Sequence, residues 1–372
     1  MSSVGLPRRG PRATDGGGLT LHTQTSVQRE PLNLRAGDLV EVLSQEEILA
    51  TLDANGEYES LQFMPEMLRY CGQRLRVYKS AHKTCDTLTR SGIRKMDNAV
   101  HLEGVRCDGG AHGGCQAACM IFWKTAWLKK VADGEPQVTA EAPEDARLLP
   151  LITLNARGPR FEDGAERYKC QATELLRSAP EVLPLMQLGQ FVTDVRTGNV
   201  GVLWSMRAVG AGMYNRFQGL SAKVLPKWAR HRGGRHWGFL KGRAVGKTPD
   251  VHKGLQPGDL VRVLSRKEIE PTLNEQLLNR GMGFDAEMAR QCGRTARIAR
   301  RIDHIVDENT GRMIHMKSPC LVLEGVICEG ALNANCPRAI TPYWREAWLE
   351  KIEEGSGGGA DPNKIPVQRA AE

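Results

Sequence analysis

Apolar and polar residues alternate along the first well-patterned stretch of the chain, at positions 37–43. This alternation follows a Gly-Asp turn and predicts a strand. Over positions 45–53 the apolar residues recur at helical spacing behind two glutamates, which predicts a short helix because acids complement the helix dipole. Positions 64–70 predict a further helical turn, and Cys71-Gly72 places a glycine where a left-handed cap would end it.

The pattern then returns to strands and ends in a stretch rich in tryptophan. Positions 75–78 and 99–105 predict two strands, and the second leads directly into Cys107. Further along, Trp123 and Trp127 are four residues apart, and Val131 follows four later, so the spacing predicts a short helix with these side chains on one face.

This whole pattern occurs twice. With an offset of 221, residues 37–131 align with residues 258–352 without a gap. The matched segments include Gly37-Asp38 with Gly258-Asp259, Cys71-Gly72 with Cys292-Gly293, Leu102 to Val105 with Leu323 to Val326, and Trp123, Trp127 and Leu128 with Trp344, Trp348 and Leu349. The chain is therefore a tandem duplication, and we call the halves copy one and copy two.

The duplication predicts the domain organisation. We expect an α+β fold that is mainly β, with two small SH3-like barrels that carry short helices and are joined by a partly helical basic spacer. The predicted boundaries are a disordered segment at 1–33, copy one at 34–132, a linker and helical spacer at 133–254, copy two at 255–353, and a disordered tail at 354–372.

Composition adds the class of protein and its compartment. Of 372 residues, 41% are hydrophobic and 25% are charged, as in ordinary globular proteins with two or three domains. The first residues lack the apolar core of a secretory signal, and no stretch reaches the roughly 18 apolar residues of a spanning helix. We therefore expect a cytoplasmic protein without a transmembrane segment, whose ten cysteines are thiols or metal ligands.

The spacer holds most of the positive charge. Its start at 132–149 is acidic and linker-like, and positions 165–188 predict a helix. From Arg196 to Lys253 there are twelve Lys or Arg against the single acid Asp250. Positions 202–225 also predict an amphipathic helix, so residues 196–253 could contact nucleic acid, an anionic membrane surface or a protein partner, or could form a solvated face of a docked helix.

Soft metal donors cluster in copy one. The candidate ligands are Cys71, Cys85, Cys107, His112, Cys115 and Cys119. The glycines at 109, 110, 113 and 114 permit a bend that brings Cys107 towards Cys115, and Cys115 and Cys119 are four residues apart. Thiolates and imidazoles bind zinc or iron–sulfur clusters, so we predict a metal site here, completed by Cys85, Cys71 or His112.

Copy two retains part of this set. Its candidate ligands are Cys292, Cys328 and Cys336. The counterparts of Cys85, His112 and Cys119 are Val306, Asn333 and Ile340, so copy two is the weaker candidate for a site. Cys71, Cys170 and Cys292 could equally be buried small hydrophobic residues, because free cysteine is among the most buried residue types.

Several motifs resemble known families. The Gly-Asp-Leu-Val opening strand resembles SH3-like barrels, including KOW-type modules. The run H-L-E-G-V-R-C-D-G-G-A-H-G-G-C-Q at 101–116 and the segment 323–349 resemble a family of uncharacterised bacterial proteins, which implies no activity. The run C-D-G-G-A-H also resembles the end of the CDGSH iron–sulfur motif, although one extra residue intervenes and the upstream C-x-C pair is absent.

Three classes of function follow. The first is a metal-binding or iron–sulfur protein that acts through interaction or electron transfer. The second is a nucleic-acid-binding protein that uses KOW-like barrels and the basic spacer. The third is an oxidoreductase or other enzyme at the cysteine loop, although the chain lacks G-x-S-x-G, a phosphate-binding glycine loop and H-E-x-x-H.

Overall fold

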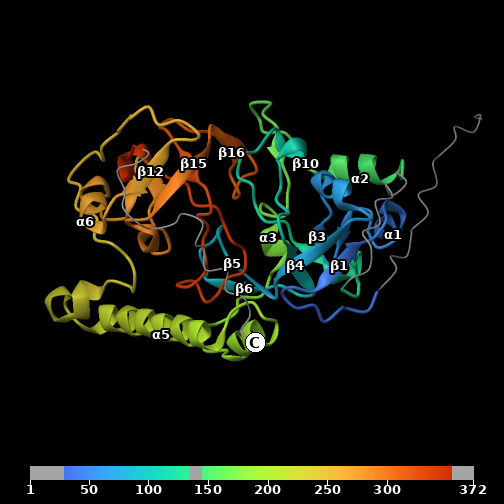
Figure 1. Cartoon of the computed structure of the whole chain (residues 1–372), viewed down its shortest axis with the longest axis horizontal. Coiled ribbons are helices and arrows are strands. Elements are labelled where there is room, and N and C mark those ends of the chain that lie inside the picture. The colour runs from blue at the N-terminus through green and yellow to red at the C-terminus, as the bar shows by residue number, and fades with distance from the viewer. Residues whose placement is uncertain (1–28, 134–144, 354–372) are drawn as a thin grey trace, which may run out of the picture.

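The computed structural model describes residues 29–133 and 145–353. Most of the predicted disordered lead-in, part of the acidic linker and the predicted tail lie outside the described residues. Figure 1 shows two lobes of strands and short helices side by side, with one long helix running beneath them. The sheets are small and antiparallel, and helices and strands are mixed, as in an α+β fold.

Copy one is built around a five-stranded sheet in the order β8-β7-β4-β1-β9. Its strands are β1 (Leu39–Val42), β4 (Arg74–Ser80), β7 (Ala99–Leu102), β8 (Trp123–Lys124) and β9 (Leu128–Lys130). The other elements are α1 (Gln45–Leu49), β2 (Glu57–Tyr58), β3 (Leu61–Gln62), β5 (Lys83–Cys85), β6 (Ile93–Lys95) and the 3₁₀ helices η1 (Pro65–Tyr70), η2 (Gly110–His112) and η3 (Thr125–Trp127). Ser44 caps α1 through a reciprocal capping box with Glu47.

Copy two repeats this arrangement in a sheet of order β18-β15-β12-β19. Its strands are β12 (Leu260–Val263), β15 (Thr295–Arg301), β18 (Leu321–Leu323) and β19 (Leu349–Lys351). The remaining elements are α6 (Arg266–Ile269), η6 (Glu270–Thr272), β13 (Leu278–Asn279), β14 (Met282–Gly283), η7 (Met288–Gln291), β16 (His304–Val306), β17 (Met313–His315) and η8 (Glu346–Trp348). The register repeats as well, because Val40 pairs with Leu75 and Val261 with Ala296.

Neither sheet closes into a barrel among the described residues. The end strands β8 and β9 of copy one pair with one neighbour each and not with one another. Both sheets carry an irregularity at the same place, between Val77 and Lys79 in β4 and between Ile298 and Arg300 in β15. Such a bulge bends a strand locally. The SH3-like barrels are therefore not confirmed, whereas the mixed α+β class is.

Paired tryptophans form the centre of each core. Phe63 meets Trp123 and Trp127 edge-on, with ring centroids 6.1 and 5.2 Å apart. In copy two, Phe284 meets Trp344 and Trp348 in the same way, at 6.1 and 5.0 Å. All four tryptophans are fully buried, and the indole nitrogens of Trp127 and Trp348 donate to the hydroxyls of Thr51 and Thr272. The sequence repeat is thus a repeat of core packing.

The helix predicted around these tryptophans is wrong. Trp123 lies in β8, a 3₁₀ turn follows, and Leu128–Lys130 form β9, which pairs with β1. Hydrogen bonds to β7 and β1 therefore hold this segment in strands, despite the four-residue spacing of its apolar side chains. The helix predicted over 165–188 is also wrong, because only α3 (Leu175–Ser178) is helical there and Pro180 follows it.

The first part of the spacer packs against copy one, and the long helix follows it. Its elements are α2 (Leu148–Asn155), β10 (Arg157–Gly158), β11 (Arg167–Tyr168), α3, α4 (Gly189–Arg196), α5 (Val202–Val224) and the 3₁₀ turns η4 (Lys227–Ala229) and η5 (His231–Gly234). Leu148, Ile152 and Leu175 belong to the core of copy one. The predicted helix over 202–225 is confirmed as α5. No helix among the described residues has the length and apolar character needed to cross a membrane.

The two copies contact each other reciprocally. Both hairpins, β5–β6 and β16–β17, lie between the lobes (Figure 1). The backbone N–H of Cys85 donates to Sγ of Cys336 across 3.2 Å, and the N–H of Val306 donates to Sγ of Cys115 across 3.3 Å. Each residue of the second contact lies 221 positions from its counterpart in the first. The hairpin of each copy therefore contacts the cysteine loop of the other.

Candidate metal centre

The cysteine loop of copy one, residues 107–119, folds back on itself through glycine. Gly109 has φ +76°, and a Cβ there would overlap the backbone carbonyl of Cys115. Its own carbonyl oxygen accepts from the N–H groups of His112 and Gly114, each at 2.9 Å. The loop closes where the N–H of Cys107 donates to the carbonyl of Cys119 at 2.9 Å. Only glycine suits position 109, and the bend brings both ends of the loop together.

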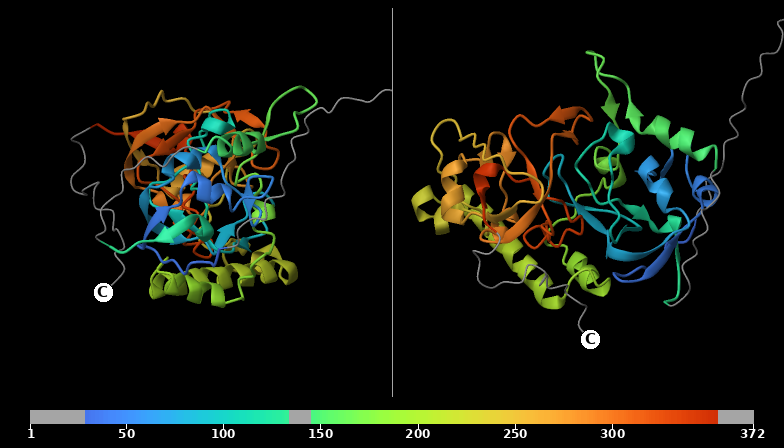
Figure 2. Two further views of the ribbon diagram at one scale, coloured as in Figure 1. Left: turned by 90° about the vertical axis from the view of Figure 1, so that its right-hand side faces the viewer. Right: turned by 45° about the horizontal axis from the view of Figure 1, so that its top comes forward.

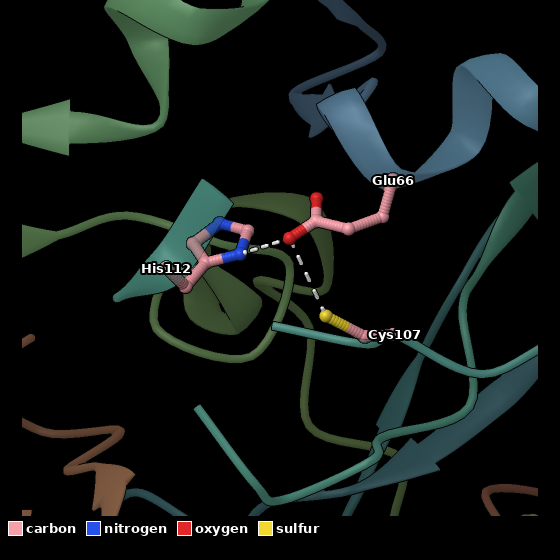
Figure 3. Close-up of side chains that lie close together, drawn as sticks. All are labelled: Glu66, Cys107 and His112. Carbon is pink, nitrogen blue, oxygen red and sulfur yellow. Dashed lines mark hydrogen bonds and ion pairs between the residues drawn. The ribbon is translucent and has the colours of Figure 1, made fainter. Parts of the chain in front are cut away.

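Glu66, Cys107 and His112 form one compact group (Figure 3). Oε1 of Glu66, at the start of η1, lies 2.7 Å from Nδ1 of His112 and 3.8 Å from Sγ of Cys107. The same oxygen accepts from the N–H of Ala111 at 3.0 Å. The three ligand atoms lie within 4.8 Å of one another, and this group could hold a metal ion.

His112 is fixed on both sides of its ring. While Nδ1 meets Glu66, Nε2 lies 3.0 Å from the backbone carbonyl of Lys169. Burial would raise the pKa of Glu66, but the hydrogen bond and charge of His112 outweigh burial and hold that pKa below its usual range. Glu66 is therefore a carboxylate, and each ring nitrogen of His112 faces an oxygen acceptor.

Four thiols line a small cavity beside this group. The cavity measures about 40 Å³, and its lining includes Cys107, Cys115, Cys119 and Cys170. The remaining wall is mostly apolar and includes Val306 of the copy-two hairpin. Burial raises the pKa of Cys119 to about 12 and that of Cys170 to about 11, and burial followed by the charge of Glu66 raises that of Cys107. A bound cation would have to displace these protons.

Backbone donors point at three of these sulfur atoms. The N–H of Val306 reaches Cys115, Gly109 bonds Cys107, and Ala172 and Thr173 bond Cys170. The bonds to Cys107 and Cys170 lower the pKa of these two thiols, although burial raises it by more. Arg338, which is buried, also lines the cavity and adds positive charge near Cys119. Hydrogen-bond donors and one cation therefore surround the sulfur atoms, although burial still holds the pKa values of Cys107, Cys119 and Cys170 above the usual range.

The structure separates the other candidates of copy one from this cavity. Cys71 is buried in the core of copy one, and burial raises its pKa to about 12. Cys85 lies where the two copies meet, in a small cluster with Cys336 of copy two. The two thiols share a hydrogen bond there, and this bond and burial raise the pKa of Cys85. Neither residue is among those that line the thiol cavity.

The cysteine loop of copy two, residues 328–340, keeps the backbone but fewer donors. Glu287 accepts from the N–H of Leu332, as Glu66 does from Ala111, and its charge acts on Cys328. Asn333 stands in place of His112 and Ile340 in place of Cys119. Cys292 is half-buried against the core of copy two. Copy two therefore has the carboxylate and two thiols of the loop without an imidazole.

Sequence reasoning missed Glu66 and gave Cys170 no place in the site. Glu66 lies 41 residues before Cys107, but the pair Glu66-Met67 recurs as Glu287-Met288, and that identity was a usable signal. Cys170 lies in the spacer, outside the repeats, and its sequence context carries no comparable signal.

Comparison with known proteins found no matching family model, no matching curated protein and no matching solved structure. The geometry of this chain therefore carries the functional argument.

Proposed function

We propose that Cys107, Cys115 and Cys119 of copy one, together with Cys170 of the spacer, hold an iron–sulfur cluster. The observation that carries the proposal is the convergence of these four thiols on one cavity. Four cysteine thiolates are the usual ligand set of both two-iron and four-iron clusters. When bound, such a cluster supplies one-electron transfer or a structural cross-link.

The size of the cavity supports a cluster over a single ion. One water-sized group needs about 10–15 Å³ of such space, whereas the cavity offers about 40 Å³. Among the described residues, no three of the four thiols have sulfur atoms within 4.8 Å of one another. A lone zinc ion holds its sulfur ligands at about 2.3 Å, so it would need them closer together.

The residues around the thiols have supporting roles. Glu66 and His112 hold the loop through Ala111 and Lys169, which fixes the direction of Cys107. The N–H groups aimed at the sulfur atoms stabilise thiolates and tune the potential of a bound cluster. Arg338 offsets negative charge, and the apolar wall limits access of water to the cavity.

A second candidate is a single zinc ion at Glu66, Cys107 and His112. The observation in its favour is the closeness of their ligand atoms. Carboxylate, thiolate and imidazole are all zinc ligands. For this arrangement His112 would give up its bond to Glu66 or to the Lys169 carbonyl, because a ligating nitrogen cannot also carry a proton.

Metal analysis separates these proposals. The full chain is purified without oxygen, and its iron, acid-labile sulfide and zinc are measured together with its visible absorption. We expect roughly two to four iron atoms per chain with matching sulfide, and their loss in Cys119→Ser and Cys170→Ser. The matched control is Cys292→Ser, which alters a half-buried thiol outside the cavity.

Other outcomes assign or reject the site. One zinc per chain that is lost in His112→Gln but kept in Cys170→Ser would replace the cluster by the zinc site. A folded chain that retains neither metal after anaerobic purification and reconstitution with iron and sulfide would overturn both proposals.

A further inference from the structure

Helix α5 presents its large apolar side chains to solvent. Within residues 202–224 these side chains are mostly three, four or seven positions apart, which aligns them along one face of the helix. Leu203 is 75% exposed and Val224 is 82% exposed. The exposed large apolar residues of the helix, called here the α5 stripe, are Val202, Leu203, Met206, Met213, Phe217, Leu220 and Val224.

The fully buried positions of α5 carry small or polar side chains, while Trp204 and Tyr214 are half-buried. Ser205, Ala208, Gln218 and Ser221 are its buried residues. Nε2 of Gln218 donates to the carbonyls of His231 and Arg235, at 2.8 and 3.1 Å. Most large apolar side chains of α5 are therefore left in solvent, whereas a helix that packs on a core ordinarily buries its apolar face.

The helix is held in place without its stripe. Gly212 leaves no room for a side chain against Leu185, and Oγ of Ser205 accepts from Nδ2 of Asn335 at 3.4 Å. Both views in Figure 2 show α5 along the outer edge of the molecule. Among the described residues nothing covers the stripe, so the stripe is not needed to anchor the helix.

Apolar exposure continues beyond the end of the helix. Leu225 is exposed, and Trp228 in η4 is 88% exposed. Monomeric proteins rarely leave a contiguous apolar surface of this kind uncovered, and such surfaces mark sites of interaction. Tryptophan is enriched where proteins meet the boundary between lipid and water.

The charge around the stripe indicates its partner. Positions 196–249 contain eleven Lys or Arg and no acid. At 100° per residue, Arg207 lies on one flank of the stripe and Arg216 and Lys223 lie on the other. The same helix of a second copy would bring like charges together. An anionic surface would instead meet both flanks with opposite charge.

We propose that α5 docks on a membrane surface rich in anionic phospholipids, with its stripe between the headgroups and its cations at the phosphates. A basic helix with an apolar face binds bilayers in this way without crossing them. Leu203, Met206 and Val224 have no aromatic face on which a base could stack, so the stripe suits lipid better than single-stranded nucleic acid. This inference does not depend on the metal centre.

Vesicle sedimentation tests the proposal with the full chain. We expect binding to vesicles of phosphatidylglycerol and phosphatidylcholine in equal parts, weaker binding at high salt, and little binding to phosphatidylcholine alone. Arg207→Glu and Arg216→Glu should each weaken binding, by roughly fivefold for every unit of positive charge removed. Lys129→Glu, which changes an exposed lysine at the edge strand β9 of copy one, is the matched control.

The apolar part of the proposal has its own matched pair. Leu203 and Leu154 are both 75% exposed, but only Leu203 belongs to the stripe. Leu203→Ser combined with Phe217→Ser should reduce vesicle binding by at least about tenfold, whereas Leu154→Ser should leave it unchanged. Circular dichroism of each variant checks that the fold is intact, as expected for substitutions at exposed positions.

Three results would overturn the proposal. The first is failure to bind the anionic vesicles, or equal binding to phosphatidylcholine alone. The second is a dimer in sedimentation velocity that the stripe variants dissociate while vesicle binding stays unchanged. The third is tight binding of single-stranded oligonucleotide, with quenching of tryptophan fluorescence, in the absence of vesicle binding.

Discussion

The cysteine loops of copy one and copy two share a backbone and differ in a few side chains. Gly114 donates to Gly109 at 2.9 Å in one loop, and Asn335 donates to Gly330 at 2.9 Å in the other. A glycine with positive φ makes both bends. The backbone alone therefore does not define a metal site, and the two loops differ in their side chains.

One equivalent pair shows how a single neighbour changes the chemistry. Glu66 and Glu287 occupy the same position, and both are buried. His112 holds the pKa of Glu66 below its usual range, whereas burial raises the pKa of Glu287, whose loop has Asn333 instead. The equivalent carboxyl groups therefore differ, because the charged form is favoured in copy one and disfavoured by burial in copy two.

The largest expected difference between the copies concerns Lys83. Its Nζ lies 2.6 Å from Oδ2 of Asp194, and both side chains are fully buried. Lys83→Met leaves this carboxylate without its cation and should cost about 3–5 kcal/mol of unfolding free energy. The counterpart of Lys83 is His304, which is partly exposed. His304→Met should cost under about 1 kcal/mol.

Urea unfolding followed by tryptophan fluorescence measures both variants. Equal losses would show that the ion pair does not distinguish the copies. If Lys83→Met loses little unfolding free energy while Asp194→Asn loses as much as predicted for the ion pair, the stabilising contact is instead the hydrogen bond between Asn335 and Asp194.

The next prediction separates the shared backbone from the metal site. Alanine at Gly109 or Gly330 would place a Cβ against the carbonyl of Cys115 or Cys336, and both glycines have positive φ. We expect each variant to lose about 2–4 kcal/mol of stability. If copy one holds the metal, only Gly109→Ala should also lower metal content after anaerobic purification. Equal metal loss in both variants would contradict the assignment to copy one.

The smallest expected effect is a pH dependence confined to copy one. Burial lowers the pKa of His101 to about 3, and its Nδ1 donates to the carbonyl of Ile121 at 2.9 Å. Between that value and the ordinary 6.5, the unfolded chain takes up a proton that the folded chain does not. This contribution to stability is therefore complete above pH 6.5 and is lost as the pH falls.

The counterpart of His101 is Val322, which makes His101→Val a natural comparison. When the pH falls from 6.5 to 5, the unaltered chain should lose up to about 2 kcal/mol more unfolding free energy than His101→Val does. Chemical unfolding at several pH values measures the difference. Parallel curves for the two proteins would show that His101 does not titrate in this way.

The repeat and its strands were predictable because their signal is local. The strands predicted at 37–43 and 99–105 became β1 and β7, and the spacing over 202–225 became α5. The helix at Trp123 failed because pairing with β1 and β7 decides the conformation there. Strand pairing with distant segments leaves no trace in a four-residue spacing.

The candidate site was predictable only within its loop. Cys107, Cys115 and Cys119 all line the thiol cavity, as their spacing with the glycines suggested. Glu66 and Cys170 come from segments far from the loop in the sequence. Cys85 contacts the cysteine loop of copy two instead, because the hairpin that carries it packs there. Which distant segments meet depends on packing between elements, and a single sequence does not record it.

The reciprocal contact between the two copies allows their cysteine loops to diverge independently. Contacts in which each half gives its hairpin to the loop of the other are those of an isologous homodimer, here joined in one chain. In two separate identical subunits, any substitution would alter both loops at once. In one chain each loop can change alone, so His112 and Cys119 coexist with Asn333 and Ile340 inside a single pseudo-symmetric interface.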